Sequence, residues 1–171
     1  MNAPTAEGHR AMNLSSALGR IPGLTLRAAS VRVSRQVTAP PERIFDAWLD
    51  AGQARAFLFA DRMWDAISAR IDARVGGDFR IVRQRDGEDV EYSGQYLEID
   101  RPYRLVFSLF VEKYAQLDDR VILELAPVAG HSLLVLTHEL SLPDPLERSR
   151  VRREWARVLG RLAALLESAR H

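Results

Sequence analysis

The sequence predicts an α+β fold: a curved antiparallel β-sheet wrapped around one long C-terminal helix, with two short helices after the first strand. Three observations predict it. A half-buried strand pattern opens the ordered part of the chain, several strand patterns follow two helical segments, and a long amphipathic helix closes the chain. Grouped strands followed by a helix favour an antiparallel sheet that is covered on one face.

Composition and charge are those of an ordinary globular domain. The chain has 171 residues, of which 47% are apolar and 27% charged, enough for one domain with a substantial core. The formal net charge of +1 gives no general attraction to nucleic acid or to anionic membranes. Cysteine is absent, which excludes disulfides, thiolate catalysis and thiolate metal sites.

The two ends of the pattern set the expected domain limits. Residues 1–28 are rich in alanine, serine, glycine and proline, and we expect a flexible N-terminal extension to a domain at 29–171. A partner-binding arm is the alternative interpretation of that segment. No apolar run reaches the roughly 20 residues that span a bilayer, and the start lacks a signal-peptide pattern. We therefore predict a cytoplasmic protein without a membrane span.

The first strand and the two short helices have clear patterns. In SVRVSRQVTA, apolar Val31, Val33 and Val37 alternate with polar residues, as in a half-buried strand. The segment PPERIFDAWLDA begins with prolines, which fit a first helical turn, and places its large apolar residues on one helical face. Gly52 is predicted to break this helix, and QARAFLFA to form a second one.

A hairpin is predicted at Asp86-Gly87, the favoured pair for a two-residue turn. Such a turn fixes the register, so Ile81 is expected opposite Tyr92, and Phe79 opposite Gly94. The alternation makes one face of the hairpin apolar; that face collects Phe79, Ile81, Val90, Tyr92 and Tyr96. The phase changes beyond Gly94, which predicts a bulge or bend near that residue.

Three more strands and the terminal helix complete the pattern. RLVFSLFVE, DRVILELAP and SLLVLTHEL are typical of strands, and the last carries His138 on its apolar face. The segment from about Leu146 to Ala169 is predicted to be one helix whose apolar stripe includes Trp155 and Leu159. Its arginines fall on a separate arc, which we interpret as solvated surface, with an acidic partner or nucleic acid as the alternative.

A cavity is expected because a strongly curved sheet cannot touch a straight helix along its whole length. Side chains or a ligand must fill the space between them. We therefore predict a ligand cavity between the sheet and the C-terminal helix, of the size that small-molecule sites have in proteins. Eight residues are expected to line it and contact the ligand: Phe79, Ile81, Tyr92, Tyr96, Phe107, His138, Trp155 and Leu159.

Several motifs resemble the SRPBCC (START-like, helix-grip) superfamily, and within it the branch that includes the C-terminal domain of the activator of the heat-shock ATPase chaperone. IDARVGGDFRI resembles its Asp-x-Arg-x-Gly-Gly-x-Phe stretch, GQYLEIDRPYRLVFS its Gly-x-Tyr-x-Glu-Ile-x-x-Pro-x-x-Leu-x-Phe pattern, and EWARVLGRL its Trp-x-x-x-Leu-x-x-Leu helix. The resemblance covers about Val31 to Glu167. It implies a helix-grip fold in a superfamily whose members bind lipids or polyketides, assist a chaperone ATPase in stress-related roles, or catalyse cyclisation.

The chain departs from that family at two places. The second small helix commonly carries a tryptophan near its end, where this chain has Phe57 and Phe59. The tryptophan of the last helix often follows a glycine, whereas Glu154 precedes Trp155 here. Both replacements are expected to reshape the mouth of the cavity, so ligand identity does not transfer.

His138 is the residue to weigh for catalysis, since it is the histidine predicted inside the sheet. An imidazole there could serve as a general acid or base or anchor a ligand; a buried histidine bonded to a neighbour is the simpler interpretation. No second histidine stands at metal-ligand spacing and HExxH is absent, so no metal or cofactor is predicted. Gly76-Gly77 lacks the Gly-Lys-Ser/Thr element of a phosphate loop.

Three functional hypotheses remain, in order of preference. The first is non-catalytic binding of a small, mostly apolar molecule, lipid- or polyketide-like, in the predicted cavity. The second is an interaction module for a protein partner such as a chaperone. The third is a cyclase-like enzyme that uses His138.

Overall fold

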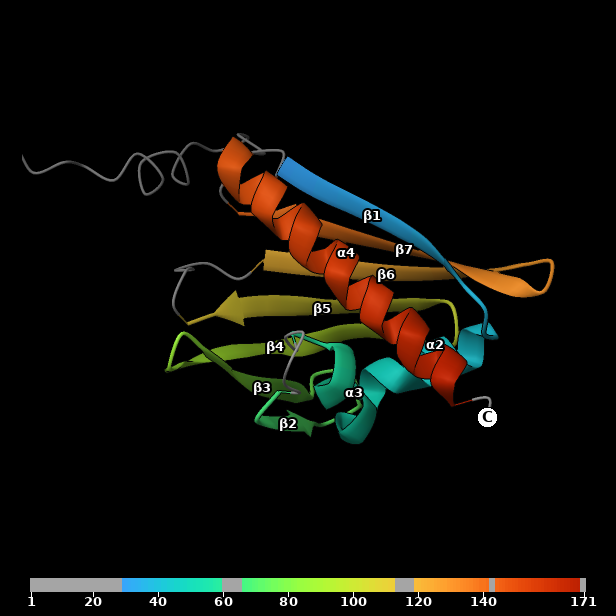
Figure 1. Cartoon of the computed structure of the whole chain (residues 1–171), viewed down its shortest axis with the longest axis horizontal. Helices are drawn as coiled ribbons and strands as arrows, with labels where there is room; N and C mark the ends of the chain where they lie inside the picture. Colours follow the sequence, from blue (N-terminus) through green and yellow to red (C-terminus); the bar gives the residue numbers. More distant parts are fainter. Residues whose placement is uncertain (1–28, 60–65, 113–118, 142–143, 170–171) are drawn as a thin grey trace, which may run out of the picture.

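The computed structural model describes residues 29–59, 66–112, 119–141 and 144–169. It confirms the α+β architecture: one seven-stranded antiparallel sheet of order β1-β7-β6-β5-β4-β3-β2, with helices on one face (Figure 1). The strands are β1 (Ala29–Val37), β2 (Ser68–Ile71), β3 (Asp78–Arg85), β4 (Glu88–Asp100), β5 (Arg104–Val111), β6 (Asp119–Val128) and β7 (His131–Leu140). The helices are α2 (Pro41–Leu49), α3 (Ala51–Phe57) and α4 (Pro145–Ser168). The expected extension, residues 1–28, lies outside the described residues.

Helix α4 crosses the sheet diagonally, and α2 and α3 lie beside its C-terminal end (Figure 1). The predicted apolar stripe of α4 is confirmed; its buried residues are Val151, Trp155, Val158, Leu159, Leu162, Ala163 and Leu166. The strand face that meets α4 is the one with alternating apolar residues, because successive strand side chains point to opposite faces. All eight residues predicted to line a cavity are buried on this side of the sheet.

The break between α2 and α3 lies at Asp50, so the prediction of a break at Gly52 was wrong. Asp50 has an extended backbone, and its side chain accepts a hydrogen bond from the backbone N–H of Gln53 at 2.8 Å. A capping carboxylate satisfies an N–H group that the first helical turn leaves free, which makes Asp50 the N-cap of α3. Gly52 lies inside that helix.

The predicted hairpin register is confirmed, with Ile81 paired to Tyr92 and Phe79 to Gly94. The irregularity lies further along β4 than predicted, between Tyr96 and Glu98, where the pairing with β5 shifts. At Gly94 itself the pairing with β3 is regular, and a glycine is required there for a different reason. A Cβ atom at this position would lie 1.8 Å from the carbonyl oxygen of Ser108 in β5, so the strands approach too closely for any side chain.

Candidate functional site

An aromatic cluster occupies the interior between the sheet and the helices. Neighbouring ring centroids lie from 3.9 to 6.4 Å apart, the separation of packed aromatic side chains. The rings belong to Trp48, Phe57, Phe59, Phe79, Tyr92, Tyr96, Phe107 and Trp155. Most of the space in which we expected a ligand is therefore filled by side chains.

A small cavity remains within this cluster. Its volume is about 10 Å³, at the lower limit for one water molecule. It is lined by Trp48, Leu58, Ile71, Phe79, Ile81, Tyr96, Leu105 and Phe107. These residues come from α2, the end of α3, and β2 to β5, so the cavity lies under α2 and α3. It differs in both place and size from the prediction of a full ligand cavity against α4.

The predicted site residues divide between this cavity and the rest of the core. Phe79, Ile81, Tyr96 and Phe107 line the cavity. The other four are buried elsewhere in the core and are absent from the cavity wall: Tyr92, His138, Trp155 and Leu159. Ligand contact stays a prediction for all eight.

Sequence reasoning missed Trp48, which forms the α2 side of the cavity. Its side chain is 2% exposed, and its ring packs against Phe57 at 5.3 Å and Phe107 at 6.2 Å between centroids. The indole Nε1 is buried and has no hydrogen-bond partner among the described residues. The helical spacing had assigned Trp48 to the core, and no local pattern shows whether an indole N–H finds an acceptor.

Tyr96 is the other wall residue whose side chain has a polar atom, its phenolic hydroxyl. Burial raises the pKa of this hydroxyl well above its ordinary value, because the ionised form is disfavoured away from water. Tyr96 therefore presents a neutral hydroxyl, which can donate or accept a hydrogen bond.

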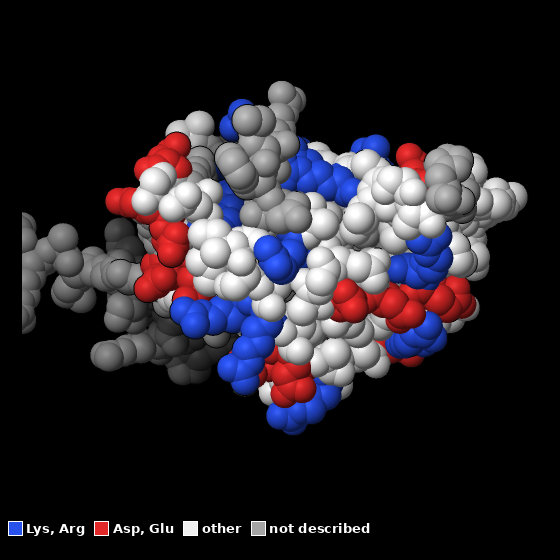
Figure 2. Space-filling view, turned by 60° about the horizontal axis from the view of Figure 1, so that its bottom comes forward, with Lys and Arg blue, Asp and Glu red and all other residues white. Residues whose placement is uncertain are grey.

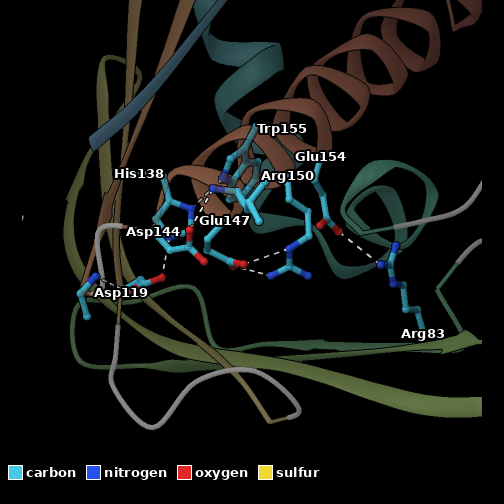
Figure 3. Close-up of polar contacts among 10 residues, drawn as sticks. Arg83, Asp119, His138, Asp144, Glu147, Arg150, Glu154 and Trp155 are labelled. Atoms are coloured by element: carbon cyan, nitrogen blue, oxygen red, sulfur yellow. Dashed lines mark hydrogen bonds and ion pairs between the residues drawn. The ribbon is translucent and has the colours of Figure 1, made fainter. Parts of the chain in front are cut away.

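A second set of polar side chains, Trp155, His138 and Asp119, lies under α4 and is joined by hydrogen bonds (Figure 3). Trp155 Nε1 donates to His138 Nδ1 at 2.9 Å, and His138 Nε2 lies 2.9 Å from Asp119 Oδ2. An indole nitrogen can only donate, so His138 Nδ1 is the accepting nitrogen and Nε2 carries the proton that it donates to Asp119. Both ring nitrogens are occupied by protein partners, which fits the simpler interpretation of His138 as a structural residue.

Asp119 holds the outer end of this chain of hydrogen bonds. Its other oxygen accepts from the backbone N–H of Ser141 at 2.8 Å. Burial raises the pKa of the Asp119 carboxyl, but the hydrogen bonds from His138 and Ser141 outweigh burial and leave the pKa below its ordinary value. Asp119 is therefore an anion that fixes the orientation of His138 and, through it, of Trp155.

The two departures from the family pattern, Phe59 and Glu154, meet at Arg83. Figure 3 shows Arg83 reaching from the sheet toward Glu154 on α4, and the two form an ion pair at 3.3 Å. Arg83 Nη1 also donates to the carbonyl oxygen of Phe59 at 3.1 Å. The ring of Phe59 stacks on Tyr92 with centroids 3.9 Å apart and contacts Trp155 at 5.5 Å. Arg83 thus anchors the end of the α3 segment against the sheet and α4.

The distribution of charged side chains on the surface does not indicate a particular kind of binding partner. On the face in Figure 2, basic and acidic side chains are interleaved, with no large area of one sign. None of the described helices is long and apolar enough to cross a membrane. Within the described ranges, no group of three or more histidine and carboxylate side chains is arranged to hold a metal ion.

The fold and this interior define a helix-grip protein, in which a curved sheet holds a long C-terminal helix. The chain belongs to the family described as activator of Hsp90 ATPase homolog 1-like protein, whose model matches residues 38–167. No curated protein matches the chain.

Solved structures share the fold. Protein CV1439 from Chromobacterium violaceum is 26% identical, with a TM-score of 0.70 over 81% of this chain and 96% of that one. DynU16, from the dynemicin biosynthetic locus, is 19% identical, with a TM-score of 0.68 over 82% of this chain and 48% of that one. PFC0360w, an HSP90 activator from Plasmodium falciparum, is 22% identical, with a TM-score of 0.62 over 81% and 96%.

Proposed function

We propose that the protein binds a small, mostly apolar molecule in the interior, at the cavity under α2 and α3. The observation that carries the proposal is the cavity wall itself. It joins six aliphatic and phenyl side chains to the unpartnered indole N–H of Trp48 and the hydroxyl of Tyr96. Sites for small ligands have this composition, a mainly apolar lining with a few polar groups.

The cavity holds too little space for such a ligand, so binding requires side chains to move. Leu58 lines the cavity, and Phe59 follows it outside helix and strand with a backbone φ of 55°. That left-handed conformation is strained for a residue with a side chain. Movement of this segment would displace Leu58 from the wall and relieve the strained backbone of Phe59, and a flat ligand ring replaces the ring contacts that Phe59 loses.

Ligand detection tests the proposal directly. Native mass spectrometry of the purified full chain, together with solvent extraction, is expected to reveal a co-purified apolar molecule or binding from a library of lipids and aromatic polyketides. A paired F107A variant is expected to change ligand affinity as well as stability, because Phe107 lines the cavity. The proposal is wrong if no library member binds and F107A changes stability alone.

An interaction module for a chaperone is the second candidate, favoured by the filled interior. The backbone N–H of Gly76 donates to the carbonyl of Tyr96 at 2.8 Å, which brings the neighbouring Val75 and Leu97 close to each other. These two side chains are 61% and 49% exposed. Exposed apolar residues at one place on a surface can mark a contact site for another protein.

A chaperone assay separates the two candidates. The protein is added to a purified Hsp90, and the rate of ATP hydrolysis and complex formation are measured. Under this second candidate the rate rises, and V75D/L97D abolishes the rise. L146D serves as control because Leu146 is also apolar and 80% exposed, but lies at the start of α4. An unchanged rate without complex formation excludes this candidate.

A further inference from the structure

Trp48, which lines the cavity, buries an indole N–H without an acceptor among the described residues. An N–H group that leaves water without gaining an acceptor destabilises the folded protein, and native structures contain few of them. The indole nitrogen can only donate, so an acceptor must complete it. Because Trp48 is itself a wall residue, an acceptor placed in the cavity lies beside this side chain.

We propose that Trp48 Nε1–H selects the ligand by donating to its oxygen, and that the ligand is a neutral apolar ring compound with a buried carbonyl or similar acceptor. This inference rests on the proposed function and adds the chemical class of the ligand. Aromatic ketones are the simplest members of that class.

A water molecule is a poor occupant of this cavity. Buried waters usually make two to four hydrogen bonds, as a general rule for protein interiors. Of the side chains that line the cavity, Trp48 and Tyr96 are the ones with a polar atom; the others are leucine, isoleucine and phenylalanine. A ligand oxygen needs one donor while the remainder of the molecule gains the apolar contacts.

The charge of the wall excludes anionic ligands from the class. No basic or acidic side chain is among the described residues that line the cavity. A carboxylate or phosphate buried here would have no counter-charge, and burying an unpaired ion is strongly unfavourable. A fatty acid is therefore a worse fit than a neutral ketone, and a plain hydrocarbon leaves the indole N–H without a partner.

The test compares two ligands of nearly equal shape, 1-indanone and indane, which differ in one carbonyl group. Their dissociation constants are measured by NMR titration against the wild-type chain and against W48F. Phenylalanine keeps an aromatic ring and removes the N–H. The wild type is expected to bind 1-indanone up to about tenfold more tightly than indane, the net effect of one hydrogen bond. In W48F this preference is lost or reversed.

The ratio of the two constants within one protein cancels changes in cavity volume, and retained indane binding shows that W48F is folded with an intact site. The same ratio in wild type and W48F overturns the inference and leaves the proposed function standing. Loss of the preference in Y96F but not in W48F assigns the donor to Tyr96 and also overturns it. If neither compound binds the wild type, this inference fails, and the library screen decides whether the proposed function fails with it.

Discussion

Trp48 and Trp155 lie side by side in the core, yet their indole nitrogens are in opposite states. Their ring centroids are 6.3 Å apart, and each side chain is 2% exposed. Trp155 donates to His138, which is bonded in turn to Asp119, while Trp48 has no acceptor among the described residues.

The difference separates the structural part of the interior from the part available to a ligand. Under α4, hydrogen bonds join Trp155, His138 and Asp119, and such a satisfied network holds one conformation. Under α2 and α3, a cavity and an unsatisfied donor lie together. The side with the unsatisfied indole N–H is the side where we propose that a ligand binds.

The largest effect is expected from F107A, which enlarges the incomplete side. Phe107 packs on Trp48, Phe79 and Tyr96, and truncation of a buried phenylalanine costs about 3–5 kcal/mol of unfolding free energy. Indane affinity should rise in this variant because the ligand fills the new space. Urea unfolding and NMR titration measure the two effects.

L134A is the matched control for F107A. Leu134 is equally buried but lies on β7, away from the cavity wall. It should lose stability without gaining affinity. Equal affinities in F107A, L134A and wild type would contradict the location of the site.

Replacing each tryptophan by phenylalanine tests the comparison itself. Both substitutions remove the same atoms, so their difference reports the hydrogen bond. W155F leaves His138 Nδ1 buried without a donor and should be about 1–3 kcal/mol less stable than W48F. Chemical denaturation of the two variants measures this difference. Equal stabilities would mean that the two indoles do not differ as described.

D119N probes the outer end of the bonded chain. The new amide presents an N–H₂ group to His138 or to Ser141, both of which donate to the carboxylate now, so one donor loses its acceptor. We expect a loss of about 1–3 kcal/mol at neutral pH. D46N is the control, because Asp46 forms an exposed ion pair with Arg101 and should change stability far less.

The pH dependence of the D119N effect follows from the lowered pKa of Asp119. A carboxyl whose pKa is depressed in the folded state contributes stability above its unfolded pKa, about 3.9, and loses that contribution as the pH falls through the folded value. The difference between wild type and D119N should therefore be full at pH 7 and shrink below about pH 4. A difference that is constant from pH 7 to pH 3 would contradict this assignment.

The smallest effect is expected from R83M, which removes the hydrogen bond that holds the backbone of Phe59 against the sheet. Methionine keeps much of the apolar stem but removes the hydrogen bond to the Phe59 carbonyl and the ion pair with Glu154. Stability should fall by about 1 kcal/mol. Ligand affinity should rise a few-fold, about two to five times, because the closed arrangement is less favoured. Calorimetric titration with 1-indanone measures the rise.

Arg80 offers the control for Arg83 on the same strand. It pairs with Glu91 on the opposite face of β3, with 60% of its side chain exposed. R80M should leave ligand affinity unchanged. A similar gain in R80M and R83M would show that the anchor of Phe59 does not control access.

The sequence predicted the elements whose signals are local. The Asp86-Gly87 pair set the hairpin register, and helical periodicity identified the buried stripe of α4. The sequence indicated an irregularity near Gly94, and the register shift lies just beyond it, between Tyr96 and Glu98. The close approach of Ser108 to Gly94 was not predictable, because it depends on a neighbouring strand.

The site could be predicted only in part. Phe79, Ile81 and Tyr96 were assigned to the inner face because the alternation of their hairpin shows which face is apolar, whereas the strand of Phe107 is apolar on both faces. The sequence could not predict whether each indole N–H has an acceptor, since this depends on contacts between residues far apart in the chain, such as Trp155 and His138. The family departures were expected to reshape the mouth of a cavity, but no sequence pattern indicated that Arg83 contacts both Phe59 and Glu154.

The most direct measurement is the NMR signal of each indole N–H in protein labelled with ¹⁵N-tryptophan, assigned with W48F and W155F. In the free protein, Trp155 should show the downfield shift of a hydrogen-bonded indole, and Trp48 should not. Addition of 1-indanone should move the Trp48 signal downfield, while indane should not give this downfield shift and Trp155 should stay unchanged. A Trp48 signal that is already downfield in the free protein, or that responds equally to both compounds, would contradict the account.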